Sequence, residues 1–233
     1  LDGVLNATDV EVNNGQIDSL LATGLDEGRH NWTMNVSDIS GLTYIAMIRF
    51  FLVDYSPPFV NLTGPPYNST STSGSVNFNF TTIDTFDTVM VCNLTINGTV
   101  VDPAFNANNG SPVSRPISGL TDGIKAWNVT CKDNLNNTNT SETFWVNVTV
   151  APTVSLTSPS SGYSQNSAEL NLTYTPSDNT GFQFCQLILN SRINLTNDTI
   201  SNNNVNNFTL TGLSTGIYNW TVNCSDVIGL TAL

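Results

Sequence analysis

One phrase occurs three times along the 233-residue chain and limits its possible folds more than any other feature. Each copy reads Leu-x-x-Gly-x-x-x-Trp and ends in Asp, and the copies span residues 25–38, 120–133 and 213–226. Self-similarity at a fixed period marks a repeated structural unit. Its tryptophans lie 95 and 93 residues apart, so the sequence predicts repeats of one domain with these residues in its core: Trp32, Trp127 and Trp220.

Apolar residues occupy every second position in several segments of the repeats. This alternation runs through residues 76–80, 90–96, 127–131 and 144–150. A period of two is typical of a half-buried strand, and no segment of comparable length has a helical period. Short strands separated by Gly, Pro, Asn and Asp clusters predict an all-β fold with one β-sandwich per repeat.

The repeat resembles the immunoglobulin-like and fibronectin type III-like modules of large microbial, especially archaeal, cell-surface proteins. The resemblance rests on the pattern Leu120, Gly123, Trp127, Cys131 and Asp133 with its two counterparts, and it covers essentially the whole chain. It implies tandem immunoglobulin-like β-sandwich domains, a cell-surface location and a structural or adhesive role.

Proline-containing segments at 55–58 and 150–153 separate the repeats, because proline ends strand pairing. The expected domains are 1–55, with C-terminal strands only; 56–151, complete; and 152–233, without its last strand. Neither joint carries a flexible run, so we expect a stiff rod.

The interrupted outer repeats have two interpretations. A sandwich without an edge strand exposes backbone donors and core unless another chain supplies the strand. The chain is therefore expected to be either an excerpt of a longer array or a subunit that exchanges strands within a fibre. Residues 43–53 are more apolar than residues 138–148, as in a strand buried on both faces. An ordinary last strand beside an interdomain contact explains this equally well.

Four cysteines occupy matched positions in two repeats. Cys92 and Cys131 are 39 residues apart, and so are Cys185 and Cys224. Of three possible pairings, only the pairing within each repeat respects the period. Two disulfides require an oxidising compartment. Metal binding by these thiols is disfavoured, because no second Cys or His lies at ligand spacing.

The glycosylation signal Asn-x-Ser/Thr is far more frequent than chance pairing of these residue types predicts. Many of these asparagines fall on the outward phase of strands, so we expect many, though not all, to carry glycans that shield edges and backbone. The candidate positions are Asn6, Asn31, Asn35, Asn61, Asn68, Asn79, Asn93, Asn97, Asn109, Asn128, Asn136, Asn139, Asn147, Asn171, Asn194, Asn197, Asn207, Asn219 and Asn223.

Charge and hydropathy exclude two classes of partner. The net charge of −12 repels phosphate backbones, so nucleic-acid binding is not expected. The longest apolar stretch, residues 44–53, contains Arg49 and is too short to cross a membrane as a helix.

Candidate catalytic and metal-ligating residues are scarce. A single histidine, His30, excludes most histidine-dependent triads and any histidine-rich metal site in this chain. Acidic turns at 37–41, 177–181 and 225–229 have oxygen ligands for calcium, although turn capping explains them equally well. No enzyme activity and no cofactor other than covalent N-glycans is therefore expected.

The sequence thus predicts a structural subunit of a glycosylated extracellular filament, sheath or surface stalk. Its partners would be other copies of itself in a fibre, or neighbouring repeats of a longer chain. The alternative is the stalk of a cell-surface adhesin. A sugar-binding module of a secreted enzyme would need a row of exposed aromatic residues, and only Trp145 fits that requirement.

Overall fold

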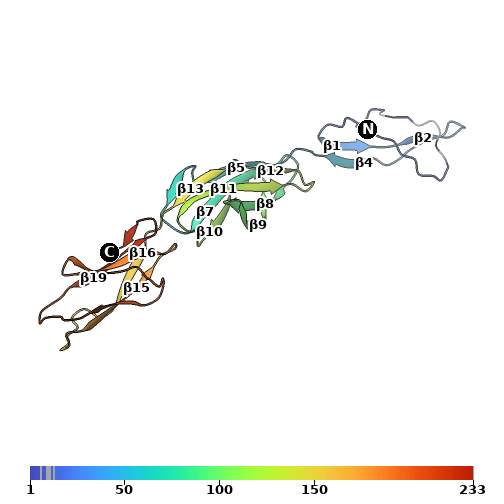
Figure 1. The fold of residues 1–233 in the computed structure, drawn as a ribbon. Helices are drawn as coiled ribbons and strands as arrows, with labels where there is room; N and C mark the ends of the chain where they lie inside the picture. Colours follow the sequence, from blue (N-terminus) through green and yellow to red (C-terminus); the bar gives the residue numbers. More distant parts are fainter. Residues whose placement is uncertain (6, 9–11, 13, 233) are drawn as a thin grey trace.

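The computed structural model describes residues 1–5, 7–8, 12 and 14–232. Every regular element in these residues is a β-strand. Figure 1 shows the strands in three groups that follow one another along an elongated molecule. We call them the first unit (β1–β4), the second unit (β5–β13) and the third unit (β14–β20).

The second unit contains nine strands. They are β5 (Phe59–Gly64), β6 (Ser69–Ser71), β7 (Val76–Ile83), β8 (Val89–Ile96), β9 (Thr99–Asn108), β10 (Val113–Ile117), β11 (Gly123–Lys132), β12 (Thr138–Thr140) and β13 (Phe144–Val148). One sheet has the order β10-β7-β5, and the other has the order β6-β13-β11-β8-β9 with β12 also paired to β11. All pairs are antiparallel except β6 with β13.

The core of the second unit lies between these two sheets. Buried and outward residues alternate along β7, β8 and β11, as the period of two predicts. Phe78, Phe80, Leu94 and Trp127 have no exposed surface, and the rings of Phe78 and Trp127 lie 5.0 Å apart, edge to face. Burial of each large apolar side chain contributes about 1.5–3 kcal/mol. The predicted all-β, immunoglobulin-like sandwich is confirmed.

The third unit repeats this architecture. Its strands are β14 (Thr153–Ser158), β15 (Leu170–Ser177), β16 (Phe182–Leu189), β17 (Arg192–Asn197), β18 (Asn206–Leu210), β19 (Trp220–Asp226) and β20 (Thr231–Ala232). A sheet of order β14-β15-β18 faces one of order β17-β16-β19-β20. Leu172, Tyr174, Leu187 and Val222 form the centre of its core.

Both predicted disulfides are present, one in each of these units. Cys92 of β8 lies opposite Cys131 of β11, and Cys185 of β16 lies opposite Cys224 of β19. The Cα atoms are 4.1 and 4.0 Å apart. All four side chains are fully buried. Each disulfide therefore joins neighbouring strands of one sheet, whereas the antibody disulfide connects two sheets.

The first unit has four short strands: β1 (Gly28–Trp32), β2 (Asn35–Ser37), β3 (Thr43–Ile45) and β4 (Arg49–Val53). β1 pairs with β4, and β2 pairs with β3. Trp32 lies opposite Arg49 in the register that places Trp127 opposite Phe144 in the second unit. The apolar segment 43–53 therefore includes the last strand of its own unit.

The structure corrects one predicted core residue. Trp127 has no exposed surface, and Trp220 is half-buried against the core of the third unit. Trp32, by contrast, is 41% exposed, because no second sheet packs over β1 among the described residues of the first unit. The repeated phrase thus predicted its strand but not its burial.

Candidate metal centres at the junctions between units

At each joint, an acidic residue at the same repeat position accepts a hydrogen bond from the backbone of the chain that leaves the unit. Glu27 Oε1 accepts a hydrogen bond from the backbone N–H of Tyr55 at 2.8 Å. In the next repeat, Asp122 Oδ1 accepts one from the N–H of Val150, also at 2.8 Å. Both donors lie just beyond the last strand of a unit. The two joints are therefore held in the same way where the chain leaves each sandwich.

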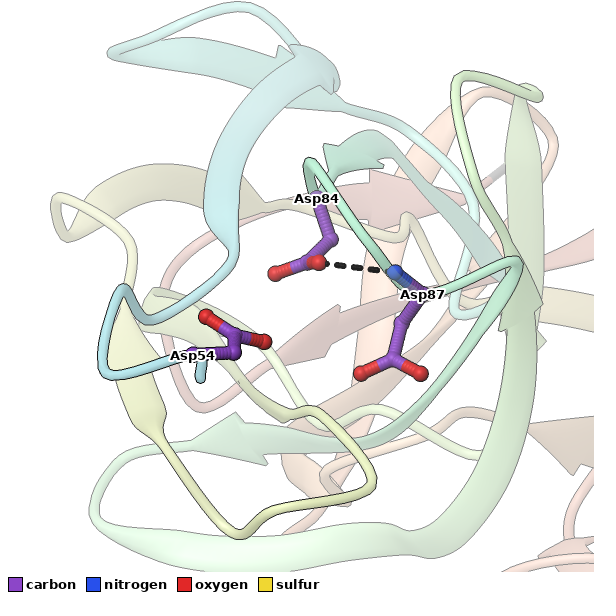
Figure 2. Close-up of side chains that lie close together, drawn as sticks. All are labelled: Asp54, Asp84 and Asp87. Carbon is purple, nitrogen blue, oxygen red and sulfur yellow. Dashed lines mark hydrogen bonds between the residues drawn. The ribbon is translucent and has the colours of Figure 1, made fainter. Parts of the chain in front are cut away.

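Three carboxylates gather at the junction of the first and second units. Asp54 follows β4 directly, while Asp84 and Asp87 lie in the connection between β7 and β8. One oxygen from each lies within 4.8 Å of the others (Figure 2). Asp84 Oδ1 accepts hydrogen bonds from the N–H groups of Phe86 and Asp87, both at 2.9 Å, and this fixes the connection.

A second group of three carboxylates lies at the junction of the second and third units. Asp122 precedes β11, Asp178 follows β15 and Asp226 ends β19, and their oxygens also lie within 4.8 Å of one another. Asp178 Oδ2 accepts hydrogen bonds from the N–H groups of Thr180 and Gly181, at 2.7 and 2.8 Å. The Thr180 hydroxyl lies 3.2 Å from Asp122 Oδ2, to which it donates, so it joins the two units.

Each group contains a buried carboxylate oxygen that has no hydrogen-bond donor among the described residues. Asp226 is fully buried; its Oδ1 accepts from the N–H groups of Ile228 and Leu230, but its Oδ2 has no partner. Asp178 Oδ1 and Asp54 Oδ2 are in the same state. A buried charge without a partner is strongly unfavourable, so these oxygens are candidate ligands for a cation.

The electrostatics of Asp54 reflect this crowding. Burial raises the pKa of the Asp54 carboxyl above its ordinary value, and the negative charges of Asp84, Asp133 and Glu27 raise it further. A hydrogen bond from the Ser56 N–H acts in the opposite direction. The first junction therefore concentrates negative charge in a place that water reaches poorly.

Two asparagines hold the acidic connections in the same way in the second and third units. Asn109 Oδ1 accepts from the Asp84 N–H at 3.2 Å, and its amide donates to the Asp84 carbonyl at 2.6 Å. Asn202 makes the same pair of bonds with Asp178, at 3.1 and 2.7 Å. The position of the acidic residue at the start of each connection is thus built into the repeat.

The donor chemistry of both groups is oxygen only. Carboxylate oxygens suit hard cations such as Ca²⁺ and Mg²⁺, whereas Zn²⁺ sites favour Cys and His. Of the acidic turns singled out in the sequence, two supply ligand candidates here, through Asp178 and Asp226. The third does not: Asp38 Oδ1 accepts from the N–H groups of Ser40 and Leu42, and so caps its own turn.

Four members of the two groups escaped the sequence analysis because they come from segments distant in the chain. They are Asp54, Asp84, Asp87 and Asp122. A usable signal was present, since Asp84 and Asp178 occupy the same repeat position, as do Asp133 and Asp226. Repeated acidic residues at the ends of strands could have been traced to the ends of the sandwiches.

None of the candidate glycosylation sites that the structure describes is buried. Asn35, Asn61, Asn171, Asn207 and Asn219 are among the exposed ones. The remaining exposed sites are Asn68, Asn97, Asn136 and Asn194, and the half-buried sites are Asn31, Asn79, Asn93, Asn109, Asn128, Asn139, Asn147, Asn197 and Asn223. Asn6 lies outside the described residues.

His30 and Lys125 both have structural environments. His30 lies between the Asp2 carboxylate, 2.6 Å from Nδ1, and the Asp26 carbonyl, 2.8 Å from Nε2. Lys125 is buried, and its ammonium donates to the Thr121 hydroxyl and the Asp122 carbonyl, both at 3.1 Å. These contacts hold both side chains in place.

An open groove of about 920 Å³ lies in the third unit. It is lined by Leu172, Leu189 and Trp220 and by residues of the connection from Pro159 to Ala168. Its lining contains no His, Cys, Asp, Glu, Lys or Arg. Its polar side chains are hydroxyls and amides, among them Tyr163 and Tyr218.

No protein-family model matches the sequence, and no curated protein is similar to it. Solved structures do show a likeness. Fibronectin(III)-like modules of CbhA from Clostridium thermocellum share 17% identity at a TM-score of 0.34, over 75% of this chain and 90% of theirs. The PKD domain of an M14-like peptidase from a Thermoplasmatales archaeon shares 19% at 0.35, over 41% and 99%.

A third structure belongs to a 1.5-MDa bacterial ice-binding adhesin, with 17% identity and a TM-score of 0.29 over 76% of this chain and 62% of that one. The first two of these structures are modules of the fibronectin(III)-like and PKD kinds. The sheets, the core and the disulfides described above place this chain in the same broad class, all-β proteins of immunoglobulin-like sandwiches. No helix in the described part of the chain is long and apolar enough to cross a membrane.

Proposed function

We propose that this chain is a rod-forming structural segment of a glycosylated extracellular filament, sheath or stalk. The observation that carries the proposal is the direct bonding between successive units. Asn137 Nδ2 donates to the Asp54 carbonyl at 3.2 Å across the first joint. Asn179 Nδ2 donates to the Leu120 carbonyl at 3.0 Å across the second. Such bonds favour a fixed end-to-end arrangement of the sandwiches (Figure 1).

Three further properties support an extracellular structural role. Two disulfides persist only in an oxidising compartment. The candidate glycosylation sites lie at or near the surface wherever the structure describes them. The open groove of the third unit is lined by hydroxyl, amide and apolar side chains, with no His, Cys or charged residue. Together these features favour a role in which the chain supplies length and stiffness rather than chemistry.

Solution scattering of the secreted chain tests the rod. We expect a maximum dimension that corresponds to three units placed end to end, and a profile typical of an elongated particle. A compact, roughly spherical particle would contradict the proposal.

Sedimentation and electron microscopy of native material then separate a filament from an adhesin stalk. A filament subunit self-associates into polymers of regular repeat, with copies of this chain as its partners. Single rods without contacts between copies, even at high concentration, would favour the adhesin stalk. Both outcomes leave the rod itself intact.

A further inference from the structure

The two groups of carboxylates have the same place in the repeat. Asp84 and Asp178 are 94 residues apart. Asp84 begins the connection between β7 and β8, and Asp178 begins the equivalent connection between β15 and β16. In both groups the remaining ligand candidates include a residue of the preceding unit, Asp54 or Asp122. Each group therefore spans a joint and shares one repeat position, that of Asp84 and Asp178, while its other two members come from different positions.

An acidic group on its own does not define a site, but the second junction contains a stronger observation. Asp226 has no exposed surface, one of its carboxylate oxygens belongs to the group, and its Oδ2 has no donor. Asp178 Oδ1 and Asn179 Oδ1 are buried acceptors without donors at the same joint. In the first junction Asp54, 9% exposed, has an Oδ2 in the same condition. Buried acceptors of this kind need a positive partner.

No side chain of the described residues supplies that positive charge. The nearest lysine at the second junction, Lys125, donates to the Thr121 hydroxyl and to a backbone carbonyl, not to a carboxylate. The ion pairs that the described residues form lie elsewhere and are His30 with Asp2 and Arg115 with Asp102. The missing charge must therefore come from outside the chain.

We propose that each junction binds one calcium ion, held by Asp54, Asp84 and Asp87 at the first joint and by Asp122, Asp178 and Asp226 at the second. Oxygens on opposite sides of a Ca²⁺ ion are about 4.6–5.2 Å apart, and those around Mg²⁺ at most about 4.2 Å. The ligand oxygens lie within 4.8 Å of one another, a spacing that fits around Ca²⁺. Backbone carbonyls and water complete its coordination.

Binding has a mechanical consequence, because each ion joins carboxylates of two successive units. Without calcium, three carboxylates repel one another across the joint. With calcium, all three groups are attracted to the ion, which holds the angle between the sandwiches. The binding itself does not depend on the proposed rod function; only the stiffening of a rod does. A scattering result against the rod and a calorimetric result against calcium binding would therefore be independent of each other.

Titration of the calcium-free full chain with CaCl₂ in a calorimeter tests the sites. We expect one ion per junction, with a Kd of roughly 10⁻⁴–10⁻³ M as in other extracellular modules. The variant Asp226→Asn keeps an oxygen for the Ile228 and Leu230 N–H groups and should lose one of the two ions. Asp84→Asn likewise keeps an oxygen for the Phe86 and Asp87 N–H groups and should lose the ion at the first junction. Neither change creates a glycosylation signal.

The matched control is Asp198→Asn, an exposed aspartate of the third unit outside both groups, which should bind like the wild type. Thermal unfolding adds a second measurement, in which the effect of Asp226→Asn on the unfolding temperature should differ between EGTA and calcium. In EGTA, Asp226→Asn should unfold at the same or a higher temperature than the wild type, because it removes repulsion. In calcium it should lack the rise that the wild type shows.

Unchanged binding in Asp226→Asn and Asp84→Asn would overturn the proposal, as would a wild type that binds no calcium. Equal affinity for Mg²⁺ would overturn the assignment of the ion. An Asp226→Asn chain that is destabilised equally with and without calcium would show that Asp226 only caps its turn.

Discussion

The protonation of His30 can be followed individually, because it is the only histidine of the chain. Its hydrogen bond to Asp2 raises the pKa of His30 above 6.5 and lowers that of Asp2 below 3.8. The stability that comes from charged His30 is present below about pH 6.5 and is lost as the pH rises through its raised pKa. The stability that comes from charged Asp2 is present above about pH 4 and is lost on acidification. The pair should therefore stabilise the first unit most between these limits.

Titration of the His30 ring by NMR checks this prediction. We expect a pKa above 6.5 in the wild type and a return toward 6.5 in Asp2→Asn. Asp18→Asn, an exposed aspartate in the same unit, serves as the control and should leave the titration unchanged. A His30 pKa that is the same in all three chains would contradict the contact.

Asn109 should escape glycosylation although it lies in a complete signal. Both hydrogens of its amide are used, since Nδ2 donates to the Asp84 and Asp87 carbonyls at 2.6 and 2.7 Å. A glycan replaces one of these hydrogens and would break the clamp. Exposed sites such as Asn61 and Asn171 have no such constraint. Glycopeptide mass spectrometry of native material should find sugar at Asn61 and Asn171 and none at Asn109; occupied Asn109 in folded protein would contradict the clamp.

At the scale of elements, the β8–β11 disulfide closes a loop of 39 residues. In the chain-entropy model such a crosslink stabilises its domain by about 3–4 kcal/mol. Replacing Cys92 and Cys131 together with Ala should lower the free energy of unfolding of the second unit by this amount. The unfolding transition of the third unit, which keeps Cys185–Cys224, is the internal control. Chemical denaturation that shows equal stability with and without the bond would contradict the prediction.

The strands themselves could be predicted where one face is buried. In β7, β8 and β11 the period of two follows directly from the pleat, so the side chains named from the sequence are the buried ones. The short strands β6 and β10 carry too few apolar residues to show a pattern. Trp32 shows the limit of the method, because its strand matches β11 but its burial depends on a second sheet.

The candidate metal centres were harder to predict for a different reason. Asp122, Asp178 and Asp226 are separated by 48 to 104 residues, and Asp122 meets the other two only because one sandwich is placed on the end of the next. Periodicity describes what happens within a repeat and is silent about contacts between repeats. Only the turns that contain Asp178 and Asp226 could be named in advance, and without their common partner they resembled ordinary capped turns.

At the scale of the whole molecule, the disulfides limit how far the chain lengthens under tension. Pulling on the two termini unravels a sandwich from its ends, but the 39-residue loop between Cys92 and Cys131 stays closed. At 3.3–3.6 Å per residue, this withholds roughly 130 Å of extension. Single-molecule stretching should therefore show unfolding steps of the second unit that grow by about this length after reduction. Steps of equal length would contradict it. In the extracellular rod that we propose, the disulfides would thus limit how far a flow that pulls on the two ends can separate them.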